Sequence, residues 1–110
     1  MKPLTDDQRK LLVRFLQGDN VIFDGDSWGY TGAGDLQLIP DFTTYEDLGK
    51  LKDKLVENGE WSIFFYFAMQ AFAIEQGDRL EGYDWEYAAW LFRPKSCGLV
   101  AEYLEQKEGK

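Results

Sequence analysis

Apolar residues spaced three and four positions apart predict a helix near the start of the chain. We expect it to begin at Thr5, where Gln8 completes a capping box, and to end at Gly18. Its apolar face consists of Leu11, Leu12, Phe15 and Leu16. Polar and charged residues fill most of the other positions, so this helix is expected to cover one side of a core.

The same spacing predicts a second helix, from Thr43, where Glu46 completes a capping box, to Asn58 and the glycine after it. Its apolar face consists of Leu48, Leu51 and Leu55. A closing helix is predicted over Lys95–Lys107, directly after Pro94, because proline favours the first turn of a helix.

Short runs between the first two helices have the composition of strands. Val21–Phe23 combines β-branched and aromatic residues, and Leu36–Ile39 is a second apolar run that Pro40 closes. The twelve residues Asp24–Asp35 hold four glycines, a density typical of a loop.

Periodicity does not decide the two most apolar segments, Trp61–Gln76 and Asp84–Phe92, which suit buried helices or strands. We expect a single α+β domain over residues 1–110, with helices packed on a short antiparallel sheet. In this interpretation the two segments form a central hydrophobic hairpin. A mostly helical bundle is the alternative.

Composition supports one folded domain. The 110 residues are 45% hydrophobic and 16% aromatic, enough apolar surface to build a core. The longest apolar run, Trp61–Ile74, is shorter than the roughly 20 residues of a membrane helix, and no signal region follows the N-terminus. The lone Cys97 fits a reducing compartment and the role of a small buried hydrophobe. We therefore expect a cytoplasmic protein that does not bind membranes.

The charge excludes several functions. Twelve Lys and Arg against 20 Asp and Glu give a net charge of −8, and there is no histidine. Such a chain is not expected to bind nucleic acid directly or to approach anionic lipid. Without histidine it has no Ser-His-Asp or Cys-His pair and no imidazole ligand for zinc. We expect no enzyme activity and no cofactor.

The acidic residues are unevenly distributed. Between Arg14 and Lys50 there are seven acids and no basic residue, and between Lys54 and Arg93 there are seven more opposed only by Arg79. If the two runs share a face, that face would steer a basic partner and could imitate a nucleic acid in the groove of a protein that binds one. Ordinary solubility is the alternative explanation.

The predicted loop supplies the candidate partner-binding residues. They are Asp24, Asp26, Trp28, Tyr30 and Asp35. Tryptophan and tyrosine are favoured at the energetic centres of interfaces, and the carboxylates would face a basic surface. Alternatively, the two rings fold back over the core.

The same loop suggests a metal site as an alternative. Counted from Asp24, acids stand at positions 1, 3 and 12 (Asp24, Asp26 and Asp35), and Gly29 stands at position 6, as in a calcium-binding EF-hand loop. Position 5 is Trp28, which has no oxygen ligand. A small calcium- or magnesium-binding domain is thus the second hypothesis, and a plain Asp/Gly turn is the alternative that these residues favour.

A third hypothesis comes from Val21–Asp26, which is similar to the first motif of haloacid-dehalogenase-type phosphatases. That resemblance implies Asp24 as nucleophile and Asp26 as acid/base, with Mg²⁺ neutralising a phosphate. Trp28 stands where that motif has a threonine, and the chain is short for the remaining motifs.

Ile39–Thr44, Trp28 and Pro94–Leu99 together resemble the phage α-β-α sandwich domain family. Phe64–Ile74 departs from the short polar strands of that family. The resemblance implies a viral context in the cytoplasm of a host cell and no established activity. The leading expectation is therefore a non-enzymatic phage accessory protein that binds, and thereby inhibits, a host protein with a basic surface.

Overall fold

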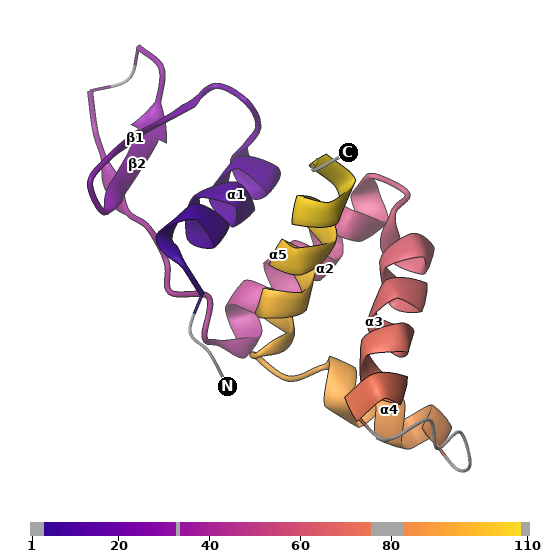
Figure 1. Cartoon of the computed structure of the whole chain (residues 1–110). Coiled ribbons are helices and arrows are strands. Elements are labelled where there is room, and N and C mark those ends of the chain that lie inside the picture. The colour runs from indigo at the N-terminus through magenta and orange to yellow at the C-terminus, as the bar shows by residue number, and fades with distance from the viewer. Residues whose placement is uncertain (1–3, 33, 76–82, 109–110) are drawn as a thin grey trace.

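The computed structural model describes residues 4–32, 34–75 and 83–108, with the backbone alone for residues 83–86. Within these residues, helices pack with a small antiparallel sheet, as the α+β expectation required. The molecule is elongated, 52 × 27 × 26 Å, with the sheet at one end and α3 and α4 at the other (Figure 1). The elements are α1 (Asp6–Gln17), β1 (Val21–Asp24), β2 (Ser27–Tyr30), β3 (Gln37–Leu38), α2 (Tyr45–Glu57), α3 (Trp61–Glu75), α4 (Tyr83–Leu91) and α5 (Ser96–Glu108).

Helix α1 has the predicted ends. The Thr5 side chain accepts a hydrogen bond from the Gln8 backbone N–H, and the Gln8 side chain accepts one from the Thr5 backbone N–H. Gly18 closes the helix at φ 94°, a conformation that favours glycine, and its N–H donates to the Arg14 carbonyl. The capping box and the terminal glycine were therefore correct predictions.

Helix α2 begins one residue later than predicted. Thr44, and not Thr43, is the N-cap, and its side chain accepts from the Asp47 backbone N–H at 3.1 Å. Two adjacent threonines offer the same capping group, so the sequence alone does not choose between them. The predicted end at Asn58 is confirmed, and α5 begins at Ser96, one residue after the prediction.

The central hydrophobic hairpin was a wrong prediction. Residues 61–75 form α3 and residues 83–91 form α4, so these segments are helical. Helix α3 contains neither glycine nor proline, and its 15 residues exceed the usual length of a strand. It is apolar on nearly every side, which removed the periodicity that would have identified a helix.

The prediction of a loop over Asp24–Asp35 was also wrong, because Ser27–Tyr30 in its first half form strand β2. Strand β2 pairs antiparallel with β1 across a two-residue turn that begins at Gly25, whose φ is 61°. A glycine at this position is favoured in type II′ hairpin turns. The second predicted strand is confirmed as β3, which pairs Leu38 with Ser27 on β2. The strand order is β1-β2-β3.

The core lies between α1, α2 and α5 and extends along α3 and α4. Fully buried side chains include Leu12, Leu51, Leu55, Val100 and Cys97. Toward α4 the core becomes aromatic: the Phe65 ring lies edge-on to Tyr87, whose hydroxyl donates to the Phe65 carbonyl at 2.6 Å. Burial of Cys97 confirms the expected small hydrophobe, and it raises the pKa of this thiol to about 12, with Asp47 adding to the effect.

Candidate binding surface on the sheet

The inner face of the sheet packs on α1. Val21 and Trp28 are buried there, and the Arg14 guanidinium lies over the Phe23 ring at 5.4 Å. Trp28 retains only 6% of its surface, so its indole belongs to the core and is not a partner contact. This is the alternative in which the ring folds back over the core.

The outer face of the sheet carries exposed aliphatic side chains. Side chains alternate along a strand, so the Ile22 side chain points away from α1, and its paired residue Gly29, which is buried, lies on the same face of the sheet. Leu38, which is 77% exposed, pairs with Ser27 on the same face, and Leu36 is exposed beside it. We call Ile22, Gly29, Leu36 and Leu38 the outer sheet face.

Gly29 allows the chain to fold closely over this face. A Cβ atom at Gly29 would lie 2.7 Å from the Leu36 side chain and 2.8 Å from the Asp35 carbonyl oxygen. Neither distance leaves room for a methyl group. The glycine therefore lets Leu36 and the backbone of Asp35 lie directly on β2.

Three predicted site residues border the outer sheet face, and we call Asp24, Asp26 and Asp35 the acidic rim. Asp24 and Asp26 flank the glycine of the hairpin turn, and Asp35 adjoins Leu36. All three are exposed, and none has an ion pair within the described ranges. Their negative charges are therefore available to a partner.

Tyr30 lies at the border of the inner face. Its ring meets Trp28 edge-on, with centroids 5.3 Å apart, and its hydroxyl donates to the Gln17 side chain at the end of α1. The ring is exposed on its remaining side. Of the two aromatic residues predicted as contacts, Tyr30 alone presents a surface to a partner.

The structure does not reproduce the predicted metal loop. Strand β2 interrupts the twelve-residue segment, and among the described residues no three acids or cysteines form a group that could hold a metal ion. Asp24 and Asp26 stand in an exposed antiparallel turn, whereas the phosphatase motif requires the end of a buried parallel strand. Neither chemical hypothesis gains support from this arrangement.

The described members of the two acidic runs lie on different parts of the molecule. The first includes the acidic rim at the sheet end, whereas Glu75 of the second ends α3 at the opposite end (Figure 1). Glu57 and Glu60 are paired with Lys54 and Lys107. The rest of the second run, namely Asp78, Glu81 and the side chains of Asp84 and Glu86, lies outside the described residues.

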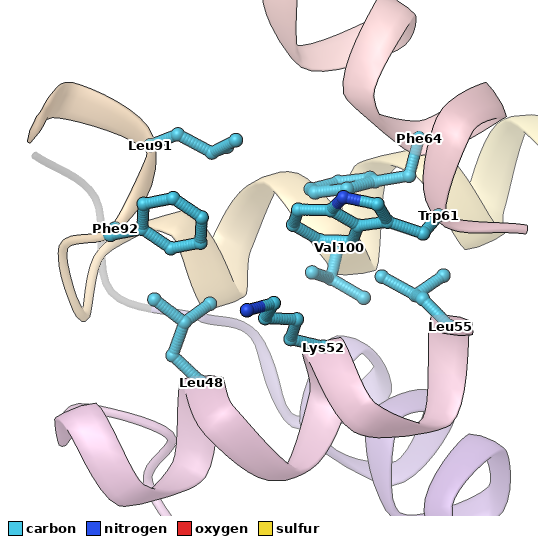
Figure 2. A pocket seen from close by; sticks show the side chains of 8 residues that line it. All are labelled: Leu48, Lys52, Leu55, Trp61, Phe64, Leu91, Phe92 and Val100. Atoms are coloured by element: carbon cyan, nitrogen blue, oxygen red, sulfur yellow. The ribbon is translucent and has the colours of Figure 1, made fainter. Parts of the chain in front are cut away.

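A void where α2, α3, α4 and α5 meet is too small to be a ligand site. Its volume is about 10 Å³, room for at most one water, and its lining is apolar apart from Lys52 (Figure 2). The Lys52 ammonium lies 5.7 Å from the Trp61 ring centre and 5.2 Å from that of Phe92. The lysine therefore closes the void by cation–π contacts.

A larger groove of about 850 Å³ runs beside the N-terminal ends of α1 and α5. Its charged side chains are of both signs, and most of them already have a partner within the protein. Arg9 pairs with Asp6 and Asp41, and Arg93 donates to the Trp90 carbonyl at 2.6 Å. No group of one charge converges in it, so the outer sheet face remains the better candidate.

The aliphatic part of the candidate surface was missed in the sequence. A signal for it exists, because Leu36 and Leu38 stand two apart, the spacing of one strand face. Comparison with family models, curated proteins and solved structures finds no match to this chain, so no relative assigns the surface a function. Among the described residues, no helix is both long and apolar enough to cross a membrane.

Proposed function

We propose that this chain is a non-enzymatic accessory protein that binds a partner protein with a basic surface. The docking site is the outer sheet face together with the acidic rim. One observation carries the proposal: three exposed carboxylates, which have no ion pair among the described residues, border three exposed aliphatic side chains on the sheet face turned away from α1.

The two parts of this surface act differently in binding. The rim carboxylates attract and orient a basic partner, which raises the association rate and makes it depend on salt. The aliphatic side chains lose contact with water when the partner docks, and this burial supplies affinity. A charged rim around an apolar centre is the usual anatomy of an interface.

The biological setting of the proposal rests on the sequence resemblance to phage proteins. In that setting the partner is a host protein that handles nucleic acid, and the chain inhibits it by occupying its basic groove in the host cytoplasm. The acidic rim is local, so it would block part of such a groove and not imitate a long duplex.

The test compares two triple variants of equal charge. D24N/D26N/D35N neutralises the acidic rim, and D53N/E57Q/E108Q neutralises three exposed acids on helices. Tagged proteins are used to capture partners from a nuclease-treated bacterial lysate. We expect the wild type and the helix triple to retain the same basic protein in equal amounts. The rim triple should retain at least roughly tenfold less of it, because tenfold is the lower end of the effect of electrostatic steering on association.

Two additions sharpen this experiment. Excess duplex DNA should displace the captured protein if its nucleic-acid groove is the docking site, and L38E should weaken capture by placing a charge in the apolar centre. Equal capture by the rim triple and the wild type, or no protein retained by the wild type, contradicts the proposal.

A further inference from the structure

Helix α3 exposes apolar side chains on the side that faces away from the core. Phe64, Ala68 and Phe72 face inward and are buried. On the opposite side, Tyr66 is 67% exposed and Ile74 is 78% exposed. A helix that is apolar on all sides is normally covered on all sides, so this face lacks a neighbour among the described residues.

The exposed face forms a continuous stripe. Ile63, Tyr66, Gln70 and Ile74 follow one another at helical spacing, and we call them the α3 stripe. Residues 61–74 contain no charged side chain. The helix lies at the end of the molecule opposite the sheet (Figure 1), so the stripe is separate from the proposed docking site.

We infer that the α3 stripe is the interface between two copies of this chain. The absence of charge on the stripe permits this partner. Two copies of net charge −8 repel each other, and the repulsion is weakest where each presents an uncharged face. A basic protein finds no carboxylate on the stripe to pair with, and the rest of the chain repels an anionic lipid surface.

Gln70 adds a second reason for self-pairing. Its amide is both a donor and an acceptor, and it interrupts an otherwise apolar stripe. In a two-fold symmetric pair each stripe meets its own copy, and with the axis beside Gln70 the two amides can hydrogen-bond to each other. A single polar residue within an apolar seam also fixes the register of paired helices.

The size of the stripe sets the strength of the pair. A helix of 15 residues is about 22 Å long, so two such helices bury less surface than a stable dimer interface. We therefore expect a reversible dimer that forms as concentration rises.

Sedimentation velocity of the full chain tests this inference over concentrations from roughly 10 μM to 1 mM, the range of weak association. The mass is expected to rise from 12.8 kDa toward twice that value. Q70E places two carboxylates face to face, and we expect it to raise the dissociation constant at least tenfold, or about 1.4 kcal/mol. Q106E makes the same charge change on α5 and should leave association unchanged.

Other outcomes overturn the inference. A mass of 12.8 kDa at every concentration, or equal effects of Q70E and Q106E, would show that the stripe does not pair. Loss of the dimer in L38E, with Q70E unchanged, would assign the contact to the sheet. Binding of the monomer to phosphatidylcholine vesicles, abolished by Q70E, would assign the stripe to a lipid surface. None of these results depends on whether the acidic rim binds a partner.

Discussion

The Glu60 side chain connects the start of α3 to α5. Its carboxylate, just before α3, accepts hydrogen bonds from the Tyr103 hydroxyl at 2.9 Å and from the Lys107 ammonium, both on α5. Burial alone would raise the pKa of Glu60, but the hydrogen bonds and the charge of Lys107 outweigh it, so the pKa is lower than usual. Burial and the Glu60 carboxylate raise the pKa of Tyr103 to about 12.

Replacing Glu60 by glutamine should destabilise the fold at neutral pH. We expect E60Q to lower the free energy of unfolding by about 1–2 kcal/mol, the difference between charged and neutral hydrogen bonds. The folded-state pKa of Glu60 lies below the unfolded value, so its contribution is complete above the unfolded pKa and is lost as pH falls through the folded pKa.

Urea unfolding of wild type and E60Q at a series of pH values measures this effect. The difference between them should shrink steadily in acid. E108Q, which changes an exposed acid on α5, should match the wild type at every pH. A difference that stays constant from neutral to acidic pH would mean that the charge of Glu60 is not what fastens α3 to α5.

At the scale of elements, the sequence predicted correctly those helices whose apolar residues recur at helical spacing. The capped, amphipathic helices α1 and α2 could be placed within a residue of their ends from spacing and capping groups. Helix α3 could not be identified because its apolar residues face both the core and the surface. Strand β2 was hidden because a glycine occupies one of its two outward positions, which removed the expected alternation.

Gly29 should tolerate no side chain. The close approach of Leu36 and the Asp35 carbonyl means that G29A must move a backbone segment, and we expect a loss of about 1–3 kcal/mol, as for other overpacked sites. Thermal unfolding measures the loss, and amide chemical shifts should change mainly in β2 and β3.

The matched control is G34A in the same segment, where a Cβ atom would meet nothing within 4 Å. It should leave stability and chemical shifts nearly unchanged. If G29A and G34A change stability and chemical shifts equally, the segment over β2 is not held against the sheet. Leu36 would then not belong to the outer sheet face.

At the scale of the whole molecule, Arg9 joins the sheet end to the helices. From α1 its guanidinium donates to the Ile39 carbonyl at 2.8 Å and the Pro40 carbonyl at 3.1 Å, and it also pairs with Asp6 and Asp41. No sequence pattern predicts such a contact, because backbone carbonyls carry no residue signature.

Lysine at this position should not replace arginine. A lysine ammonium cannot reproduce the planar fork that reaches two carbonyls, so we expect R9K to cost about 1–3 kcal/mol of stability. Hydrogen exchange should increase in residues 36–42, which the arginine holds against α1.

The comparison variant is R14K, which removes an exposed arginine from the same helix. It should change stability by less than about 1 kcal/mol, because cation–π contacts at exposed sites are weak. If R9K exchanges at the wild-type rate in residues 36–42, the sheet end is attached by side-chain packing and not by this arginine.

The length of the molecule has a consequence for how its two ends work together. The acidic rim and the α3 stripe lie at opposite ends of the long axis (Figure 1). Joining two chains through α3 would therefore leave the sheet end of each chain as a free tip that carries one acidic rim. Such a dimer is bivalent: once one tip is bound, the other is held at a high effective concentration near a second site. Two weak contacts would then give the affinity of one tight contact, but only on targets whose binding sites repeat at the distance between the two tips.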